Sequence, residues 1–218
     1  MARLKEYNGH YCESEYEYAF IGFLESEGWK YSSGNNIHRV TKRDVLIADD
    51  FKKFIADTNP DLTEDEVIQI YDNVRLVGAE SDFATLHKVY GWMVNGVQFT
   101  TQDGLPRMIP LIDFDNWDKN IFRVVNQFTV EYTNNGQKEN RRPDVLLFVN
   151  GMPLCVIELK NPADANATIY DAWEQINIRY WRDIPHLLHY CPLACISDGV
   201  KTRLGTVRTP YEHFYAWR

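Results

Sequence analysis

Apolar residues recur at helical spacing in three segments of the first half of the chain. The first segment predicts a helix over residues 14–27. The second predicts a helix that begins after Thr63, because Thr63 and Glu66 have the spacing of a capping box. The third predicts a helix that starts at 81 or 82 and ends near 94. The N-terminal portion, about residues 1–100, is therefore expected to be mainly helical.

The second half of the chain changes to strand-like patterns. β-branched and aromatic residues dominate residues 121–132, which predicts a strand that ends at the turn 134–136. Two apolar runs, 145–149 and 154–159, flank Asn150-Gly151. Asn-Gly between apolar runs is the strongest short-range signal for a hairpin. We therefore expect two antiparallel strands joined by a tight turn.

The order of the predicted elements indicates the fold class. A further helix is expected over residues 165–183, and a short strand over 193–197. Helices, then a strand and a hairpin, then a helix and a strand indicate an α/β (α+β) fold, with a mixed β-sheet flanked by helices and an N-terminal helical part. We expect one domain over residues 1–218, with its core at about 109–218.

Charge is distributed unevenly along the chain. The 218 residues carry a formal net charge of −8, which argues against a general basic coat for nucleic acid. Residues 136–218 contain 10 Lys and Arg against 9 Asp and Glu, so this near-neutral part is the better place for a polyanion. Apolar runs long enough to span a bilayer and an apolar signal-peptide core are both missing, so we expect a soluble, cytoplasmic protein without a membrane partner.

Three charged residues bracket the otherwise apolar hairpin. Asp144 precedes its first strand, and Glu158 and Lys160 close the second. Two carboxylates at one point repel each other unless a cation lies between them, and oxygen ligands of this kind suit Mg²⁺. A lysine on the same face could orient an attacking water or stabilise charge on a phosphate. By residue type alone, a surface salt bridge explains the three residues as well as a metal-dependent phosphodiesterase does.

The hairpin poses a geometric condition for this site. A plain two-residue turn pairs Asp144 with Ile157, which puts Asp144 on the face opposite to that of Glu158. The two carboxylates converge only if the hairpin gains one residue. Pro143 cannot donate to the ladder, so it makes irregular pairing plausible. We therefore predict a β-bulge in this hairpin.

The residues around the hairpin resemble a known family. The run Arg142-Pro143-Asp144, Asn150-Gly151-x-Pro153-Leu154, Ile157-Glu158-Leu159-Lys160-Asn161-Pro162 is similar to the nuclease domain of the restriction (R, or HsdR) subunit of type I restriction-modification enzymes. That domain belongs to the PD-(D/E)xK nuclease superfamily. The likeness extends to Asn126-Gln127-Phe128, Gln175, Ile184-Pro185, Ile196-Ser197-Asp198-Gly199 and Phe214-Tyr215-Ala216-Trp217.

The resemblance implies Mg²⁺-dependent endonuclease cleavage of double-stranded DNA, that is, a type I site-specific deoxyribonuclease. Asp144 and Glu158 match the metal ligands of the family, and Lys160 matches its catalytic lysine. Glu17 on the first helix is our candidate for an added metal ligand. Family members continue into a motor that uses ATP, and this chain has no phosphate loop, so we expect the motor domains and ATPase activity to be absent here. The implied partners are DNA and the specificity and methylation subunits of a restriction-modification complex.

The resemblance also indicates DNA-binding residues. The family carries a Gln-x₃-Tyr motif, whereas here Gln175 precedes Tyr180 with one residue more between them. On an α-helix this spacing turns Tyr180 away from the Gln175 face and gives the one-turn position to Arg179. A core tyrosine is an equally good interpretation of Tyr180. The candidate phosphate contacts are Arg141, Arg142, Arg179, Arg182, Lys201 and Arg203.

Two alternatives remain at this point. The chain could be a nuclease fold that serves DNA docking or assembly and is silent in isolation. It could also be a standalone PD-(D/E)xK nuclease that acts in restriction or repair.

Overall fold

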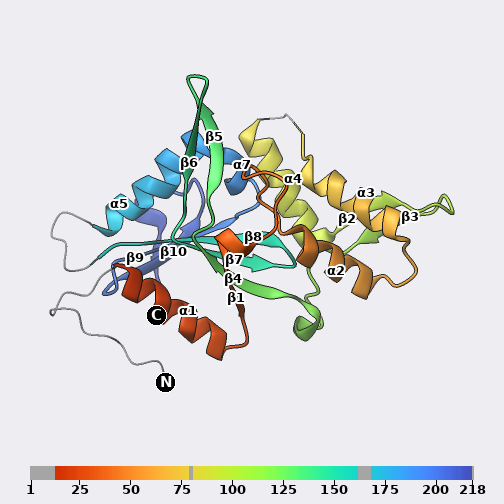
Figure 1. The fold of residues 1–218 in the computed structure, drawn as a ribbon, viewed down its shortest axis with the longest axis horizontal. Helices are drawn as coiled ribbons and strands as arrows, with labels where there is room; N and C mark the ends of the chain where they lie inside the picture. The colour runs from red at the N-terminus through yellow and green to blue at the C-terminus, as the bar shows by residue number, and fades with distance from the viewer. Residues whose placement is uncertain (1–12, 79–80, 162–167, 218) are drawn as a thin grey trace.

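A computed structural model describes residues 13–78, 81–161 and 168–217 of the chain (Figure 1). Within these residues the main sheet has seven strands in the order β1-β4-β7-β8-β9-β10-β11. The pairs β1–β4 and β8–β9 are parallel, and the other neighbours are antiparallel, so the sheet is mixed. The strands are β1 (Lys30–Ser33), β4 (Phe122–Asn126), β7 (Val145–Val149), β8 (Met152–Leu159), β9 (Leu193–Ser197), β10 (Thr202–Thr206) and β11 (Tyr215–Ala216).

Two small antiparallel hairpins are separate from the main sheet. They are β2–β3 (Val97–Thr100, Pro106–Ile109) and β5–β6 (Val130–Asn134, Gln137–Arg141). The described helices are α1 (Glu13–Ser26), α2 (Ala48–Thr58), α3 (Glu64–Arg75), α4 (Asp82–Asn95), α5 (Ile169–Glu174), the π-helical segment Gln175–Tyr180, α6 (Trp181–Asp183) and α7 (Pro185–Leu188). Short 3₁₀ turns lie at Gly34–Asn36, Trp117–Lys119 and Tyr211–His213.

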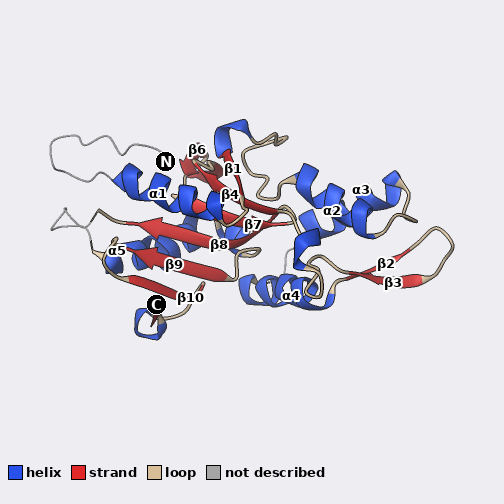
Figure 2. Cartoon of the chain, turned by 90° about the horizontal axis from the view of Figure 1, so that it is seen from below, coloured by secondary structure: helices blue, strands red, loops and turns tan. Residues whose placement is uncertain are grey.

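Helices cover both faces of the sheet. In Figure 1, α1 lies below the sheet and α5 above it, while α2, α3 and α4 extend beyond one end. Figure 2 shows the strands of the main sheet side by side, with the β2–β3 hairpin projecting past α3. Side chains alternate between the faces of β7: Val145 packs with Ile21 of α1, whereas Leu146 packs in the larger core on the other face. The same alternation determines which face of the sheet carries Asp144, Glu158 and Lys160.

The helices predicted from local signals are confirmed. α1 covers the predicted 14–27 segment, and Thr63 and Glu66 form the expected capping box at the start of α3. α4 begins after Ser81, whose side chain accepts a hydrogen bond from Ala84 N. The helix predicted over 165–183 is confirmed from Ile169 onward, and its first residues lie outside the described part.

The N-terminal portion contains α2, β1 and β2, which were not predicted. α2 has its apolar side chains at helical spacing, but its N-cap residue is Ile47, whose side chain cannot cap the helix. β1 is a short edge strand with no fully buried residue, so it lacks the alternation that marks a strand. Because β1 pairs with β4, the portion expected to be helical also supplies one strand of the main sheet.

The strand predicted over 121–132 is in fact two strands. β4 ends at Asn126, and Gln127 takes a left-handed conformation with φ of 56°. The chain leaves the main sheet there and enters the β5–β6 hairpin, which projects from the molecule (Figure 1). Composition could not reveal this break, because both sides of it are rich in strand-forming residues. The predicted turn at 134–136 is confirmed, with φ of 48° at Asn135 and 79° at Gly136.

The predicted Asn150-Gly151 turn is confirmed and is tied to the neighbouring chain. Asn150 and Gly151 have φ of 50° and 77°. The fully buried Asn150 side chain accepts a hydrogen bond from Ile121 N at 2.7 Å and donates to Leu111 O at 2.9 Å. The turn residue therefore fixes both the hairpin and the segment that leads into β4.

The fold class, an α+β mixed sheet flanked by helices, is as expected. Among the described helices, none is both long and apolar enough to cross a membrane.

Gly34 offers a test of how the start of β5 is packed. A Cβ atom at Gly34 would lie 2.5 Å from Phe128 Cα and 2.7 Å from Phe128 N. Because those atoms are backbone, they cannot move aside as a flexible side chain would. We expect Gly34→Ala to lower the free energy of unfolding by about 1–3 kcal/mol in urea titrations. As a matched control, Gly22→Ala in α1 meets nothing within 4 Å and should raise it by about 0.5–1 kcal/mol. Equal effects of the two substitutions would contradict this packing.

Candidate active site

The predicted bulge is present in the β7–β8 hairpin. Next to the turn, Phe148 pairs with Pro153, but the next pair is Leu147 with Cys155, so Leu154 is the extra residue. The ladder then continues to Val145 opposite Ile157. The irregularity lies beside Pro153, whereas the sequence indicated it at Pro143. Its effect is the expected one, because it places Asp144 opposite Glu158.

The bulge gathers the three charged residues at one end of the sheet. Glu158 and Lys160 follow Val156 on the face that carries the larger core. The Asp144 carboxylate accepts a hydrogen bond from Leu159 N at 2.8 Å, which fixes it against the end of β8. Residues far apart in the sequence are therefore brought into one cluster by the hairpin.

Both oxygens of Glu158 receive hydrogen bonds from the helical segment above the sheet. Tyr180 OH donates to Oε1 at 2.6 Å, and Gln175 Nε2 donates to Oε2 at 2.6 Å. Lys160 Nζ donates to Gln175 Oε1 at 3.1 Å. Gln175 thus links the lysine to the carboxylate, and the Glu158 side chain has no exposed surface. These contacts fix the orientation of every polar group in the cluster.

The expectation that Tyr180 turns away from Gln175 is wrong. The segment Gln175–Tyr180 is a π-helix, in which residues five apart share a face. Gln175 Nε2 consequently lies 2.9 Å from Tyr180 OH. Arg179, which an α-helix would have put in that position, is exposed and lies 3.4 Å from Glu174. The additional residue between Gln and Tyr is absorbed by the wider helix.

Burial dominates the electrostatics of the cluster. It raises the pKa of Glu158 well above the usual range, and repulsion from Asp144 raises it further. Burial and the neighbouring Glu158 likewise raise the pKa of Tyr180, so its hydroxyl remains a donor. Two adjacent carboxylates, one of them fully buried, form an all-oxygen donor set that fits a hard divalent cation such as Mg²⁺. The described residues contain no group of three His, Cys, Asp or Glu arranged to hold a metal ion.

Glu17, the candidate additional ligand, approaches the cluster from α1. It is 7% exposed, and its Oε1 accepts a hydrogen bond from Asn126 Nδ2 at 2.6 Å. Tyr31 OH in turn donates to Asn126 Oδ1 at 3.0 Å. Burial raises the pKa of Glu17, and repulsion from Asp144 adds to this, so the two carboxylates are near each other. The pairing role of Asn126 was missed, although a polar residue that closes an apolar strand was a usable signal.

The candidate DNA-binding arginines occupy different surroundings. Arg142 is exposed and lies near enough to Glu17 to oppose slightly the rise in the pKa of Glu17 that burial causes. Arg182 is exposed and is held by Asp183, with Nε 2.7 Å from Oδ1. Asp183 also holds Arg141, with Nε 2.7 Å from Oδ2. The structure therefore gathers Arg141 and Arg182 around one carboxylate and leaves Arg142 and Arg179 apart from them.

A mixed sheet with helices on both faces, and with charged residues gathered at one strand end, defines this chain as an α+β protein with a nuclease-like fold. The chain belongs to the family described as type I restriction enzyme R protein N terminus (HSDR_N), whose model matches residues 11–213. This confirms the family suggested by the sequence.

Curated relatives agree with the family assignment. A putative type I restriction enzyme MjaIXP endonuclease subunit from Methanocaldococcus jannaschii is 34% identical over 92% of this chain. The type I restriction enzyme HindI endonuclease subunit from Haemophilus influenzae is 31% identical over 94% of it. A Staphylococcus aureus type I restriction enzyme endonuclease subunit is 27% identical over 83%. The chain spans about a fifth of the length of these relatives, 20%, 20% and 18% respectively.

The buried carboxylate gives a pH-dependent prediction. Because the pKa of Glu158 is raised in the folded state, its contribution to stability is fully present below the unfolded value, about 4.3, and is lost as the pH rises through the folded value. In EDTA at pH 8, where the raised pKa makes the ionised carboxyl of Glu158 unfavourable in the folded state, Glu158→Gln should therefore raise the free energy of unfolding. The gain should vanish near pH 4 in urea titrations.

Glu66 provides a control of opposite sign. Hydrogen bonds from Thr63 N and Gln102 N lower its pKa, so its contribution to stability is present at pH 8 and is lost only as the pH falls through the folded value. Glu66→Gln should accordingly destabilise the protein at pH 8. A loss of stability in Glu158→Gln at pH 8 would contradict the burial of an ionisable carboxyl at that position.

The π-helix can be tested by deletion. Removal of the exposed Ile178 restores the Gln-x₃-Tyr spacing, so an ordinary α-helix would still direct the Gln175 and Tyr180 side chains to Glu158. Removal of Gln69, an exposed residue of α3, would instead rotate buried Ile70 and Val74 out of the core. We expect the Gln69 deletion to lower the free energy of unfolding by at least about 3 kcal/mol. The Ile178 deletion should lower it clearly less, and urea unfolding measures both effects.

Proposed function

We propose that the chain is the Mg²⁺-dependent endonuclease module of a type I restriction enzyme, and that it hydrolyses phosphodiester bonds of double-stranded DNA as a PD-(D/E)xK nuclease. The observation that supports this best is the facing pair Asp144 and Glu158, with Lys160 joined to Glu158 through Gln175. The family match and the names of the relatives, all endonuclease subunits, are consistent with it.

Asp144 and Glu158 are the residues that would hold Mg²⁺. When bound, the ion supplies a Lewis acid for the phosphate and lowers the pKa of a coordinated water. Gln175 and Tyr180 each donate one hydrogen bond to Glu158, and the Asp144 carboxyl is also in hydrogen-bond contact with it, so a cation would lie between the two carboxylates. Gln175 and Tyr180 hold these oxygens in place before substrate arrives, which removes a reorganisation cost from the reaction.

Lys160 is the proposed catalytic lysine. Its ammonium group, oriented by Gln175 Oε1, would stabilise negative charge on the phosphate or orient the attacking water at Nζ. Glu17 is proposed as a further carboxylate near the metal, held by Asn126. Tyr180 is 1% exposed and bonded to Glu158, which favours a role in orienting that carboxylate over direct contact with DNA.

DNA contacts and partners are part of the same proposal. Gln175, Arg142, Arg179 and Arg182 stay as predicted DNA-binding residues, because their side chains are at least partly exposed. The relatives are about five times longer than this chain, which supports a larger subunit whose motor part uses ATP and which works with specificity and methylation subunits. The cytoplasmic location also stays a prediction.

A plasmid nicking assay tests the proposed function. In Mg²⁺ the wild-type chain should convert supercoiled DNA to nicked and linear forms, and EDTA should abolish this. Lys160→Ala should lower the rate by at least about 10²-fold, the typical contribution of a positioned acid–base group. Lys53→Ala is the matched control, since Lys53 is 62% exposed and pairs only with Asp57 on α2 among the described residues.

Metal binding gives an independent readout. Calorimetry with Mn²⁺ should detect binding to the wild type and to Lys160→Ala, and no binding to Glu158→Ala. Metal binding without nicking by the wild-type chain would favour a docking module that is silent in isolation. Nicking that is unchanged in both Lys160→Ala and Glu158→Ala would overturn the proposed active site.

A further inference from the structure

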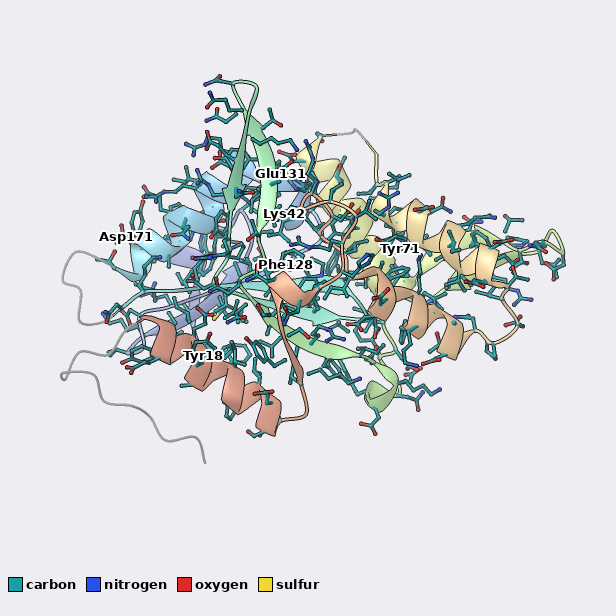
Figure 3. All side chains as sticks on the ribbon, in the orientation of Figure 1. Tyr18, Lys42, Tyr71, Phe128, Glu131 and Asp171 are labelled. Atoms are coloured by element: carbon teal, nitrogen blue, oxygen red, sulfur yellow. The ribbon has the colours of Figure 1, made fainter. Side chains whose placement is uncertain are left out.

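A polar cavity of about 550 Å³ lies beside the β5–β6 hairpin, outside the Asp144–Glu158 cluster. Its walls come from three separate parts of the chain: the hairpin, the turn that contains Arg43, and the segment of α6 and α7. Figure 3 shows Lys42 and Glu131 close together at the hairpin, where Glu131 N donates to Lys42 O at 3.0 Å. This backbone hydrogen bond joins two of the walls, so the cavity is built into the fold.

Cationic groups outnumber anionic groups in the cavity wall. Three arginines, Arg43, Arg141 and Arg182, line it together with two carboxylates, Glu139 and Asp183. Excess positive charge at this point contrasts with the net charge of −8 over the whole chain. A local basic surface on an acidic protein indicates an anionic ligand.

Both carboxylates of the wall are already engaged by the protein. Glu139 accepts hydrogen bonds from Tyr132 OH at 2.5 Å and from Asn134 Nδ2 at 2.8 Å. The hydrogen bond from Tyr132 is the main reason why the pKa of Glu139 is lowered. Asp183, with only 6% of its side chain exposed, accepts hydrogen bonds from Arg141 and Arg182 and forms an ion pair with each. Neither carboxylate is therefore directed at an incoming anion.

The arginines are oriented but retain donors. The hydrogen bonds to Asp183 use Nε of Arg141, and Nε and Nη2 of Arg182. A guanidinium has further N–H groups at its other nitrogens, and guanidinium groups held in place suit the oxygens of a phosphate. Arg141 is also fixed by the Tyr132 ring, whose centroid lies 5.2 Å from its guanidinium carbon. Two of the three cations are thus arranged before any ligand binds.

His186, which lines this cavity and a smaller neighbouring one, carries an unpaired polar atom. Its Nε2 is buried and has no hydrogen-bond partner within the described part of the chain. Buried polar atoms are nearly always paired, so an exception in a cavity wall indicates a missing partner. Burial, followed by repulsion from Arg43, lowers the pKa of His186 to about 4, so the ring is neutral at pH 7 and adds no charge.

The cavity is connected in sequence to both sides of the candidate active site. Arg141 lies at the end of β6, shortly before Asp144, and Asp183 follows Tyr180, whose hydroxyl holds Glu158. Because the elements that line the cavity lead directly into those that carry the cluster, a polyanion bound across the cluster is expected to pass the basic wall with its flanking phosphates. A free phosphate-containing ligand would satisfy the same donors, so the experiment below separates these two sources.

We propose that this cavity binds a backbone phosphate of the DNA strand that flanks the cleaved bond, with Arg43, Arg141 and Arg182 as its donors. The inference rests on the proposed function, because it takes DNA as the substrate. It assigns Arg182 to a defined subsite together with Arg141, and it adds Arg43 from a distant part of the sequence. The subsite positions the strand and takes no part in the chemistry.

The salt dependence of DNA binding tests the cavity. Binding of a fluorescent duplex is measured by anisotropy at several salt concentrations, in the Lys160→Ala background and in EDTA, so that no cleavage occurs. Each phosphate contact adds about 0.9 to the slope of log affinity against log salt concentration. Because the cavity holds one phosphate, the double variant Arg43→Ala/Arg182→Ala should lower the magnitude of the slope by about 0.9, and each single variant by a part of that amount. Arg107→Ala, which removes a partly exposed arginine paired with Asp61 outside the cavity, should leave the slope unchanged.

The outcomes separate this inference from the proposed function. A parent protein that binds the duplex with the same slope as Arg43→Ala and Arg182→Ala overturns the cavity alone. Inorganic tripolyphosphate that binds the parent and not the two variants, while duplex binding is the same in all three, reassigns the cavity to a free phosphate ligand and also overturns the inference. A parent that binds no duplex, together with a wild type that does not nick, overturns both proposals. Circular dichroism of each variant confirms that the fold is intact.

Discussion

Leu154 has no partner in the ladder between β7 and β8, and this unpaired residue decides which face of the sheet carries residues 155–160. Strand side chains alternate, so a regular hairpin would direct Asp144 and Glu158 to opposite faces. With the additional residue, Glu158 and Lys160 face the core side and Asp144 lies opposite Glu158. Every contact of the cluster, from Leu159 N to Tyr180 OH, depends on that register.

A second single-residue irregularity meets the first at Glu158. The π-helix Gln175–Tyr180 brings two donors to the carboxylate that the bulge has positioned. Neither irregularity would assemble the cluster alone, because one supplies the acceptor and the other supplies the donors. The buried Glu158 carboxyl is unfavourable when ionised, so the fold carries a local cost at the place where a cation can offset it. This conflict between stability and site chemistry is common where charged groups act on substrates.

The parts of this structure that follow from the sequence are those determined by neighbouring residues. Thr63 and Glu66 cap α3 through their own side chains, and Asn150-Gly151 forms its turn through its own backbone preference. Asp144, Glu158 and Lys160 were identified as candidate site residues because they are the charged residues at the ends of two otherwise apolar strands. β1 and the break at Gln127 were missed because long-range packing decides them: β1 pairs with β4, and Phe128 lies against Gly34. The hydrogen bond between Gln175 and Tyr180 was missed because the number of residues between them does not reveal whether the helix is an α-helix or a π-helix. The helix type decides which side chains share a face.

The β5–β6 hairpin begins and ends at the base of the site. Asn126 and Val145 are paired partners in the main sheet, so the ladder between β4 and β7 closes the excursion of residues 127–144. The hairpin tip, residues 133–138, is exposed and takes no part in that ladder, so a change at the tip leaves the register of the sheet and the positions of Asn126 and Asp144 as they are. Phe128 and Val130, at the start of the excursion, are buried in the larger core and do not share this tolerance. The ladder thus separates the carboxylate cluster mechanically from the tip of the hairpin.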